Sequence, residues 1–253
     1  MKPRPKAFGS DFGSAANIVY THSDYSDVWP AFFGQLEKHL GAFKSNYVFV
    51  DRASEGIPRH FQQIIYDDKE SYTHRLRGCL AQVPENVILF QHEDMILHST
   101  PKVEELLKLV VELDGPAPRF EAAKLVSGGV FLHLPISRHR EFRKIWRLSP
   151  WIFSIQPTIW RKSSFEQLAA LHLGQTIWEF ETKAQNTVRK LSLRTLSPKR
   201  SKNKRGRYHW DNSTYPVIST AISKGKWVFS EYETELQPIL SSYGIDPSVR
   251  GTV

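Results

Sequence analysis

The stretch Asn86–Leu97, with the sequence NVILFQHEDMIL, decides the fold class. Its first part, Val87–Phe90, is a short apolar run without polar alternation, which is typical of a strand buried on both faces in a parallel sheet. The run gives way to the polar residues His92, Glu93 and Asp94. Ligands of open α/β sheets bind at the carboxyl ends of the strands, so these residues stand where a binding site is expected.

The acidic pair in this stretch has two interpretations. Two carboxylates at the end of a buried strand are costly unless they meet a cation, so the pair indicates a divalent metal and, through the metal, a phosphate. The alternative is that the pair only caps the turn after the strand. The stretch alone does not decide between these two interpretations.

Strand and helix patterns alternate on both sides of this stretch. The expected strands cover residues 17–20, 47–50, 61–66, 87–90, 120–126 and 130–134, and the expected helices cover 32–40, 71–80, 101–113, 163–171, a segment from 178 onward and 231–243. Pro157 interrupts the extended segment Trp151–Trp160 and argues against a regular central strand there. Repeated strand–helix units predict an α/β protein with three layers, α/β/α, and a mostly parallel central sheet.

Polar residues mark the expected helix starts. Ser71 is a candidate N-cap for the helix at 71–80, and Ser99 or Thr100 caps the helix that has Pro101 in its first turn. The pattern Ser163-x-x-Glu166 predicts a capping box for the following helix.

The alternation breaks near residue 192, which suggests a division of the chain. Residues 1–16 read as a flexible leader, and residues 17–191 as the main domain. Residues 192–253 would form a basic loop and a small C-terminal hairpin and helix extension that packs on the same domain. The hairpin turn is expected at Lys224–Trp227.

Composition excludes several classes of protein. The 253 residues are 40% hydrophobic, which fits a folded globular chain, and no stretch approaches the roughly 20 apolar residues of a membrane span. Cys79 is the one cysteine, so an internal disulfide framework is excluded and a reducing, cytoplasmic compartment is expected. The chain lacks the patterns GxGxxG, GxxxxGK[ST], GxSxG and HExxH, which removes a Rossmann dinucleotide site, a P-loop, a hydrolase elbow and a zinc protease site.

The net charge of +8 is partly local, because a basic run covers Lys199–Arg207 and its flanks. Such a run is usually a solvated loop. It could instead make a peripheral contact with anionic lipids at the inner face of a membrane. Aromatic residues are not interleaved with these charges, so a nucleic-acid partner is not expected.

The remaining candidates are polar residues near strand ends and helix starts: Thr21, His22, Ser23, Asp24, Asp51, Asp67, Asp68, Arg75, Gln156, Glu179 and Glu181. Hydroxyls and carboxylates suit the recognition of a nucleoside, and a metal-holding acid suits a diphosphate. A separate carboxylate near an acceptor suits general-base chemistry. Trp151, Trp160 and Trp178 are core residues in the simplest interpretation, although one could stack on a sugar ring.

The order of these features resembles a family of GT-A-fold glycosyltransferases that includes a chlorovirus-type enzyme and uncharacterised bacterial and phage proteins. The matching pieces are Thr21–Trp29, Tyr72–Leu76, Leu89–Asp94, Ser154–Trp160, Trp178–Glu181, Tyr215-Pro216, Gly225–Trp227 and Arg250-Gly251. They extend over about residues 17–251, and the Trp178–Glu181 piece following Gln156-Pro157 is the most specific.

The resemblance implies transfer of a sugar from a UDP-, GDP- or dTDP-sugar to a glycan or glycolipid acceptor, with inversion and with Mn²⁺ or Mg²⁺. Asp94 would hold the metal in the place of a DxD motif. The donor-binding residues would be Thr21, His22, Ser23, Asp24, Asp51, Arg75, Glu93 and Gln156, with Arg75 at the diphosphate. Glu181 or Glu179 would be the catalytic base, with Glu181 preferred. Because His92-Glu93-Asp94 departs from DxD, a nucleotide-sugar or carbohydrate-binding module without turnover stays as the alternative.

Overall fold

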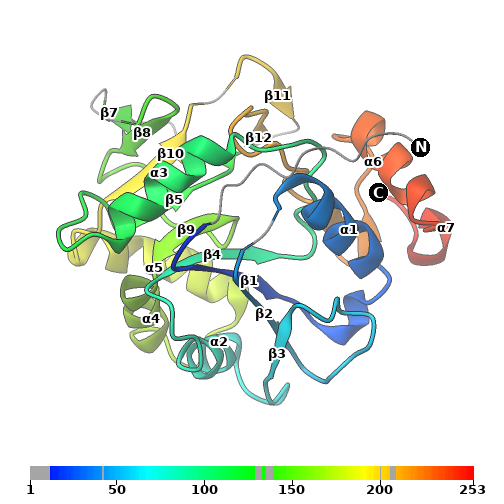
Figure 1. Cartoon of the computed structure of the whole chain (residues 1–253), viewed down its shortest axis with the longest axis horizontal. Helices are drawn as coiled ribbons and strands as arrows, with labels where there is room; N and C mark the ends of the chain where they lie inside the picture. The colour runs from blue at the N-terminus through cyan, green and yellow to red at the C-terminus, as the bar shows by residue number, and fades with distance from the viewer. Residues whose placement is uncertain (1–11, 42, 129–132, 135–138, 200, 206–208) are drawn as a thin grey trace.

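The computed structural model describes residues 12–41, 43–128, 133–134, 139–199, 201–205 and 209–253 (Figure 1). Within these residues the central element is a nine-stranded sheet in the order β3-β2-β1-β4-β9-β5-β10-β8-β7. Its strands are β1 Ala15–Tyr20, β2 Ser45–Val50, β3 Gln62–Ile65, β4 Val87–His92, β5 Ala122–Lys124, β7 His133–Leu134, β8 Phe142–Ile145, β9 Thr158–Arg161 and β10 Thr195–Pro198.

Most strands of this sheet run in one direction. The strands β3, β2, β1 and β4 are parallel neighbours, and β9 lies antiparallel between β4 and β5. β10 is parallel to β5, and β8 runs against both β10 and β7. The carboxyl ends of β1, β3, β4 and β5 therefore meet at one edge of the sheet.

Helices cover both faces of the sheet. They are α1 Trp29–His39, α2 Tyr72–Leu80, α3 Val103–Asp114, α4 Lys162–Ala170, α5 Ile177–Lys190, α6 Glu233–Ser242 and α7 Pro247–Arg250, with a short 3-10 helix at Ser23–Tyr25. In β1, Ile18 packs in the cluster with α2, α4 and α5, while its neighbour Val19 packs with α1, α3 and α6 (Figure 1). This confirms the expected architecture of three α/β/α layers around a mostly parallel sheet.

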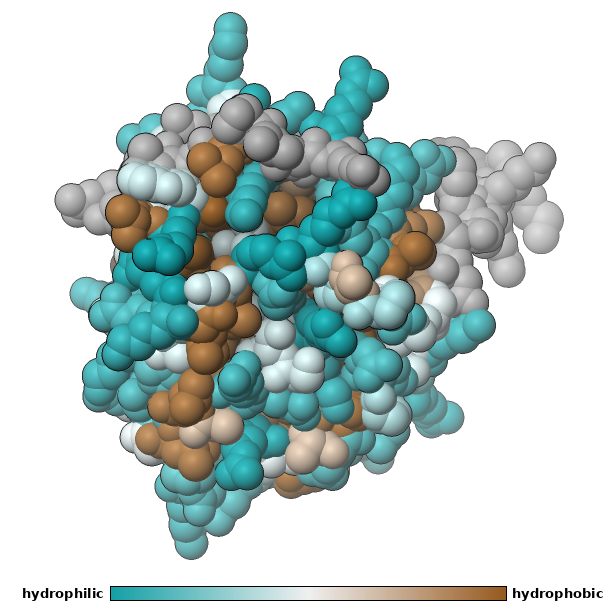
Figure 2. All heavy atoms as spheres, turned by 90° about the vertical axis from the view of Figure 1, so that its left-hand side faces the viewer, coloured by the Kyte–Doolittle hydropathy of each residue, from teal (hydrophilic) through white to brown (hydrophobic). Residues whose placement is uncertain are grey.

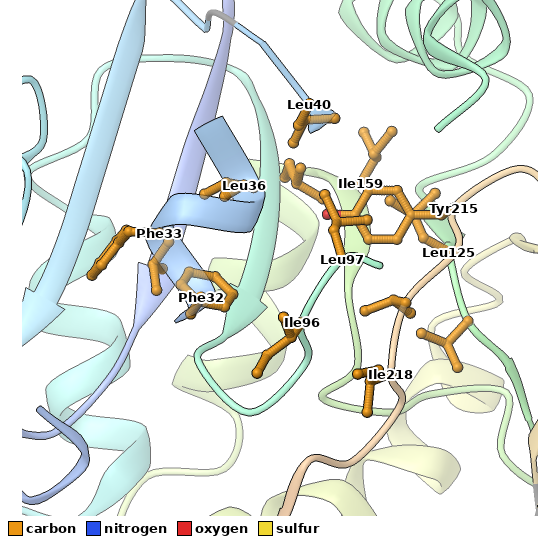
Figure 3. Packing of buried hydrophobic residues seen from close by; sticks show 14 of the residues in the cluster. Phe32, Phe33, Leu36, Leu40, Ile96, Leu97, Leu125, Ile159, Tyr215 and Ile218 are labelled. Atoms are coloured by element: carbon orange, nitrogen blue, oxygen red, sulfur yellow. The ribbon is translucent and has the colours of Figure 1, made fainter. Parts of the chain in front are cut away.

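The C-terminal residues belong to the same core as the first helix. Figure 3 shows Phe32 and Leu36 of α1 on one side of Ile96 and Leu97, with Tyr215 and Ile218 beyond them. The Tyr215 hydroxyl donates to Gln91 Oε1 of β4 at 2.9 Å. β10 itself lies inside the central sheet, so the residues after 192 contribute a strand to the main sheet and not only the expected extension.

The start of the chain also differs from the expectation. β1 begins at Ala15, and the buried ring of Phe12 stacks on Phe43 with centroids 4.1 Å apart. Residues 12–16 are therefore packed and cannot be part of a flexible leader, while residues 1–11 lie outside the described residues.

Two expected helix starts are wrong. α3 begins at Val103, and Pro101 stays outside it, because the Lys102 N–H donates to the Thr214 carbonyl at 3.0 Å and ties this segment to the C-terminal chain. α4 begins at Lys162, directly after β9, so Ser163 lies inside the helix and makes no cap. The expected Ser71 cap of α2 is confirmed, since its hydroxyl accepts from the His74 N–H.

The expectation for Pro157 is also wrong. β9 begins at Thr158 and occupies a central position between β4 and β5. A proline just before a strand removes no hydrogen bond from its ladder, so Pro157 ends the preceding turn segment without disturbing the strand.

The expected C-terminal hairpin and helix are confirmed. β13 Ile222–Ser223 pairs with β14 Lys226–Trp227 across Lys224 and Gly225, which have φ values of 51° and 77°. Positive φ at both central positions is the requirement of the tight hairpin turn. Elsewhere β6 Ser127–Gly128, β11 Lys204–Arg205 and β12 His209–Trp210 form a three-stranded sheet. The expected strand at 130–134 falls partly outside the described residues, and its described part is β7.

Among the helices of the described part of the chain, none has both the length and the apolar character required to cross a bilayer.

Candidate active site

A cavity of about 880 Å³ opens at the sheet edge where the strand ends meet. Its walls come from the residues that follow β1, β3, β4 and β5, from α2 and α5, and from the β13–β14 hairpin. Of the residues named from the sequence, Thr21, His22, Arg75, Glu93, Asp94, Gln156 and Glu181 line the cavity, and Ser23, Asp24, Asp51 and Glu179 do not.

The acidic pair after β4 lies in the wall of this cavity. Glu93 is 6% exposed, and its Oε2 is buried without a hydrogen-bond partner among the described residues. Burial raises the pKa of both Glu93 and Asp94, and the charge of Asp94 raises that of Glu93 further. A buried carboxylate oxygen without a partner is rare and costly, and a bound cation would satisfy it.

His92 forms a neutral part of the same wall. It is the last residue of β4, and burial lowers its pKa to about 4, so the ring is uncharged at neutral pH. Its Nε2 lies 3.4 Å from the hydroxyl of Tyr72 in α2. His92 therefore contributes a polar surface without adding charge beside the acids.

Arg75 of α2 lines the cavity with its guanidinium held in place. It forms an ion pair with Asp68, its Cζ lies 4.9 Å above the centroid of the Tyr66 ring, and its Nε is buried without a partner in the described structure. Nε2 of His22 also reaches Asp68, at 3.3 Å. The cavity wall thus holds a cation in a fixed position, which suits an anionic ligand.

The other three residues expected at the donor support the loop behind His22. Asp51 accepts 2.7 Å hydrogen bonds from both the N–H and the hydroxyl of Ser23. Partial burial acts to raise the pKa of Asp51, but the bonds from Ser23 outweigh it and hold the pKa below its usual value. The Asp24 N–H donates to Nδ1 of His22 at 3.1 Å. These contacts fix the His22 backbone and ring at the cavity wall.

The two glutamates of α5 lie on different faces of the helix. Glu179 accepts a 3.0 Å bond from the Thr176 N–H, completes a capping box with it, and pairs with Lys183 at 3.3 Å. Glu181 lines the cavity, and its Oε1 accepts from the Ile155 N–H at 2.9 Å. Residues two apart on a helix face different directions, which explains why Glu181 lines the cavity and Glu179 does not. The spacing Thr176-x-x-Glu179 is that of a capping box and could have identified the role of Glu179 from the sequence.

Lys124 and His209 line the cavity and were not anticipated. Lys124 is 2% exposed and donates to the Trp151 carbonyl at 3.0 Å; burial lowers its pKa to about 8, against the opposing effect of Glu181. Gln156 Nε2 donates to His209 Nε2 at 2.9 Å. Burial and, to a smaller extent, the nearby charge of Lys124 lower the pKa of His209 to about 4. A lysine within the largely apolar run at 120–126 could have marked Lys124 as a candidate site residue, whereas no sequence pattern marked His209.

The three tryptophans have different positions. Trp160 is buried and stacks on Phe165, as expected of a core residue. Trp151 and Trp178 are 41% and 75% exposed and line the cavity. Two exposed aromatic rings therefore line the same cavity as Glu181, whereas the simplest interpretation of the sequence placed them in the core.

The described residues contain no group of three or more His, Cys, Asp or Glu side chains placed to hold a metal ion. Mg²⁺ in phosphate-binding sites is usually held by one or two carboxylates, with substrate oxygens and waters completing its shell. Asp94 and the unpartnered oxygen of Glu93 fit this kind of site.

No protein-family model matches the sequence, and no curated protein matches it. Among solved structures, the chain is similar to S. aureus TarS 1-349 in complex with UDP, with 14% identity, a TM-score of 0.46, and coverage of 72% of this chain and 57% of that one. It is also similar to 4-diphosphocytidyl-2C-methyl-D-erythritol synthase from Anaerococcus prevotii, with 9% identity, a TM-score of 0.44, and coverage of 73% and 87%.

A third similar structure is the mannosyltransferase PcManGT from Pyrobaculum calidifontis in complex with GDP-Man and Mn²⁺, with 13% identity, a TM-score of 0.35, and coverage of 49% and 39%. The chain spans 48% to 59% of the TarS 1-349 structures to which it is similar. All of these TM-scores lie below 0.5, so the likeness concerns part of the fold and carries no functional assignment.

Proposed function

We propose that the chain is a glycosyltransferase that moves a sugar from a nucleotide-diphosphate sugar to a glycan or lipid-linked acceptor. One observation carries this proposal: a single cavity joins a buried acidic pair with an unpartnered oxygen, a fixed arginine and a second carboxylate on another element. The sequence resemblance to GT-A-fold glycosyltransferases supports it independently.

The donor would lie along the strand ends. Thr21 and His22, positioned by Ser23 and Asp51, suit the nucleoside, and Arg75 suits the diphosphate. Asp94, with the free oxygen of Glu93, would hold Mn²⁺ or Mg²⁺ against the same diphosphate. Such a cation neutralises the negative charge that develops on the leaving diphosphate.

The transferred sugar would lie toward Gln156 and Glu181. As the bond between the anomeric carbon and the phosphate oxygen breaks, its electron pair leaves with the diphosphate, and the sugar becomes oxocarbenium-like. Arg75 stabilises the departing charge. The acceptor hydroxyl attacks the anomeric carbon from the face opposite the leaving diphosphate, so the anomeric centre is inverted. The hydroxyl gives its proton to Glu181.

The geometry of Glu181 supports this role. The Ile155 N–H holds one carboxylate oxygen at 2.9 Å, so the side chain is fixed at the cavity wall. Glu179 is engaged at the helix cap and has no access to the cavity. The exposed rings of Trp151 and Trp178 offer flat surfaces on which the sugar rings of an acceptor could stack.

Thermal stabilisation by UDP-, GDP-, dTDP- and CMP-sugars, each with and without Mn²⁺, tests the donor site. We expect a shift with one nucleotide class that grows with metal and is lost in Asp94→Asn but kept in the exposed control Glu104→Gln. A metal-dependent shift without transfer to any glycan acceptor would favour the binding module. No shift with any donor would refute the nucleotide-sugar site.

A further inference from the structure

The segment Arg143–Trp151, here called the WRLSPW segment after its second half, exposes large apolar side chains outside the core. Trp146, Leu148 and Trp151 are 40%, 58% and 41% exposed. Single exposed apolar residues are common on protein surfaces, but apolar residues gathered in one short segment mark an interaction surface. Figure 2 shows hydrophobic patches among hydrophilic side chains on the side of the molecule that carries β8 and β7.

The backbone of the segment is fixed. The Ser149 N–H donates to the Trp146 carbonyl at 2.8 Å, which closes a turn with Leu148 near its tip. Arg189 of α5 donates to the carbonyls of Arg147 and Ser149, at 3.2 and 3.1 Å. The apolar side chains are therefore presented from an ordered turn, which lowers the entropy lost when they are buried.

Trp151 is held in an unfavourable conformation. Its φ of 57° lies in the left-handed region, which a bulky residue rarely adopts, and its carbonyl accepts from the buried Lys124. Such strain persists where the surroundings impose it, and it is concentrated at functional sites. Here the strain accompanies a tryptophan whose ring stays outside the core.

The charge of the segment selects its partner. Between Glu141 and Glu166 the sequence has no acidic residue, whereas the segment itself carries Arg143, Lys144 and Arg147. Among the described residues, no carboxylate pairs with these three side chains, and Arg143 and Arg147 are exposed. A surface of tryptophan, leucine and unpaired basic residues matches the interface of an anionic membrane, where tryptophan sits at headgroup level.

The Lys199–Arg207 run is less suited to this role. Arg205 is engaged by the carboxylates of Asp211 and Glu235. It lies over the Tyr232 ring, 5.2 Å from the centroid, so its charge serves the packing of α6. The run also offers no large apolar side chain to enter the interface.

We propose that the WRLSPW segment docks the protein on an anionic phospholipid surface. Trp146 and Leu148 would enter the interface, while Arg143 and Arg147 would meet phosphate headgroups. Trp151 ends the segment and also lines the cavity, so docking would bring the cavity mouth beside the lipid. The proposal does not depend on the proposed transferase activity.

Co-sedimentation with vesicles tests the apolar part. We expect the full chain to bind phosphatidylcholine vesicles that contain about a third phosphatidylglycerol, and not phosphatidylcholine alone. Trp146→Ser/Leu148→Ser should lower the partition coefficient about tenfold. The control Val111→Ser/Val249→Ser removes two residues that are 72% and 84% exposed on α3 and α7, and it should bind like the wild type.

A second pair of variants tests the charges. Arg143→Gln/Arg147→Gln should weaken binding about 5-fold per charge, or about 25-fold together, and flatten its dependence on salt. Arg59→Gln/Lys69→Gln, near the β3 edge of the sheet, removes the same charge elsewhere and should have a much smaller effect. All variants should remain folded and keep the wild-type donor response, which separates this test from that of the proposed function.

Four outcomes would overturn the proposal. The wild type could fail to bind anionic vesicles, or the segment variants could bind as well as their controls. Loss of binding to soluble glycans, with vesicle binding unchanged, would identify an acceptor-sugar surface. Dissociation of a dimer by Trp146→Ser/Leu148→Ser would identify an interface between copies of the chain.

Discussion

The two glutamates of α5 allow a prediction in which activity and stability separate. Glu181→Gln should lower kcat by a factor of about 10² to 10⁴, the usual contribution of a general base, which corresponds to about 3–5.5 kcal/mol of activation free energy. The amide oxygen of glutamine can still accept from the Ile155 N–H, so the fold and KM for the donor should change little.

The matched variant is Glu179→Gln, two residues away on the same helix. Its carboxylate caps the N-terminus of α5 and pairs with Lys183 outside the cavity. Its loss should leave kcat unchanged and lower the melting temperature slightly, because a negative charge near a helix N-terminus is stabilising.

Steady-state transfer kinetics and thermal unfolding of both variants would test this reasoning. Single-turnover measurements would show whether the loss in Glu181→Gln falls on the chemical step. Equal, modest losses of kcat in the two variants would refute Glu181 as the base. A large loss in Glu179→Gln alone would refute the geometric argument itself.

Four further predictions follow from other residues. Asp94→Asn should lose most of the transfer activity and the metal-dependent donor shift while melting as a folded protein; near-wild-type turnover would contradict its assignment. Burial lowers the pKa of Lys124 from 10.5 to about 8, so between these two pH values the unfolded chain still binds the lysine proton and the folded chain does not. The free energy of unfolding should therefore rise with pH over this range. Lys124→Met should remove the rise in urea titrations. Thr195→Val removes a buried hydroxyl without a partner and should be neutral or stabilising, whereas Thr158→Val loses a 2.8 Å bond to a backbone carbonyl and should cost about 1 kcal/mol by urea unfolding. Tyr215→Phe leaves Gln91 Oε1 without its 2.9 Å donor and should cost about 1–3 kcal/mol, or roughly 2–12 °C in melting temperature; no change would show that the C-terminal segment is not coupled to β4.

The sequence predicted the parallel half of the sheet well because β1, β2 and β4 are apolar runs buried on both faces, and hydrophobicity reports such burial directly. The sequence did not predict the elements whose position or start is determined by contacts with distant parts of the chain. β10 follows the break in alternation, yet it pairs with β5 and β8 inside the sheet. The start of α3 depends on a bond to Thr214, far along the chain, which no local pattern contains.

The candidate site was predicted for a topological reason. Polar residues after parallel strands meet at one edge, so Thr21, Glu93 and Asp94 could be placed together without knowing the loops. Lys124 ends β5 at the same edge, and its place in a largely apolar run was a signal in the sequence. His209 had no such signal, because β12 reaches the cavity through a separate small sheet. In the structure His209 forms a hydrogen bond with Gln156, and the charge of Glu181 acts on Lys124.

The acidic pair connects the energetics of the fold with the proposed chemistry. Burying Glu93 beside Asp94 opposes ionisation of both groups, and Oε2 of Glu93 gains no hydrogen bond within the described chain. Hydrophobic packing of β4 against α3 does not require these carboxylates, since neighbouring Ile96 and Leu97 supply the core contacts. A ligand that brings positive charge would relieve this cost, and Arg75 would meet the negative end of the same ligand. A cation bound together with a diphosphate satisfies both requirements, whereas a neutral sugar alone would leave the acids uncompensated.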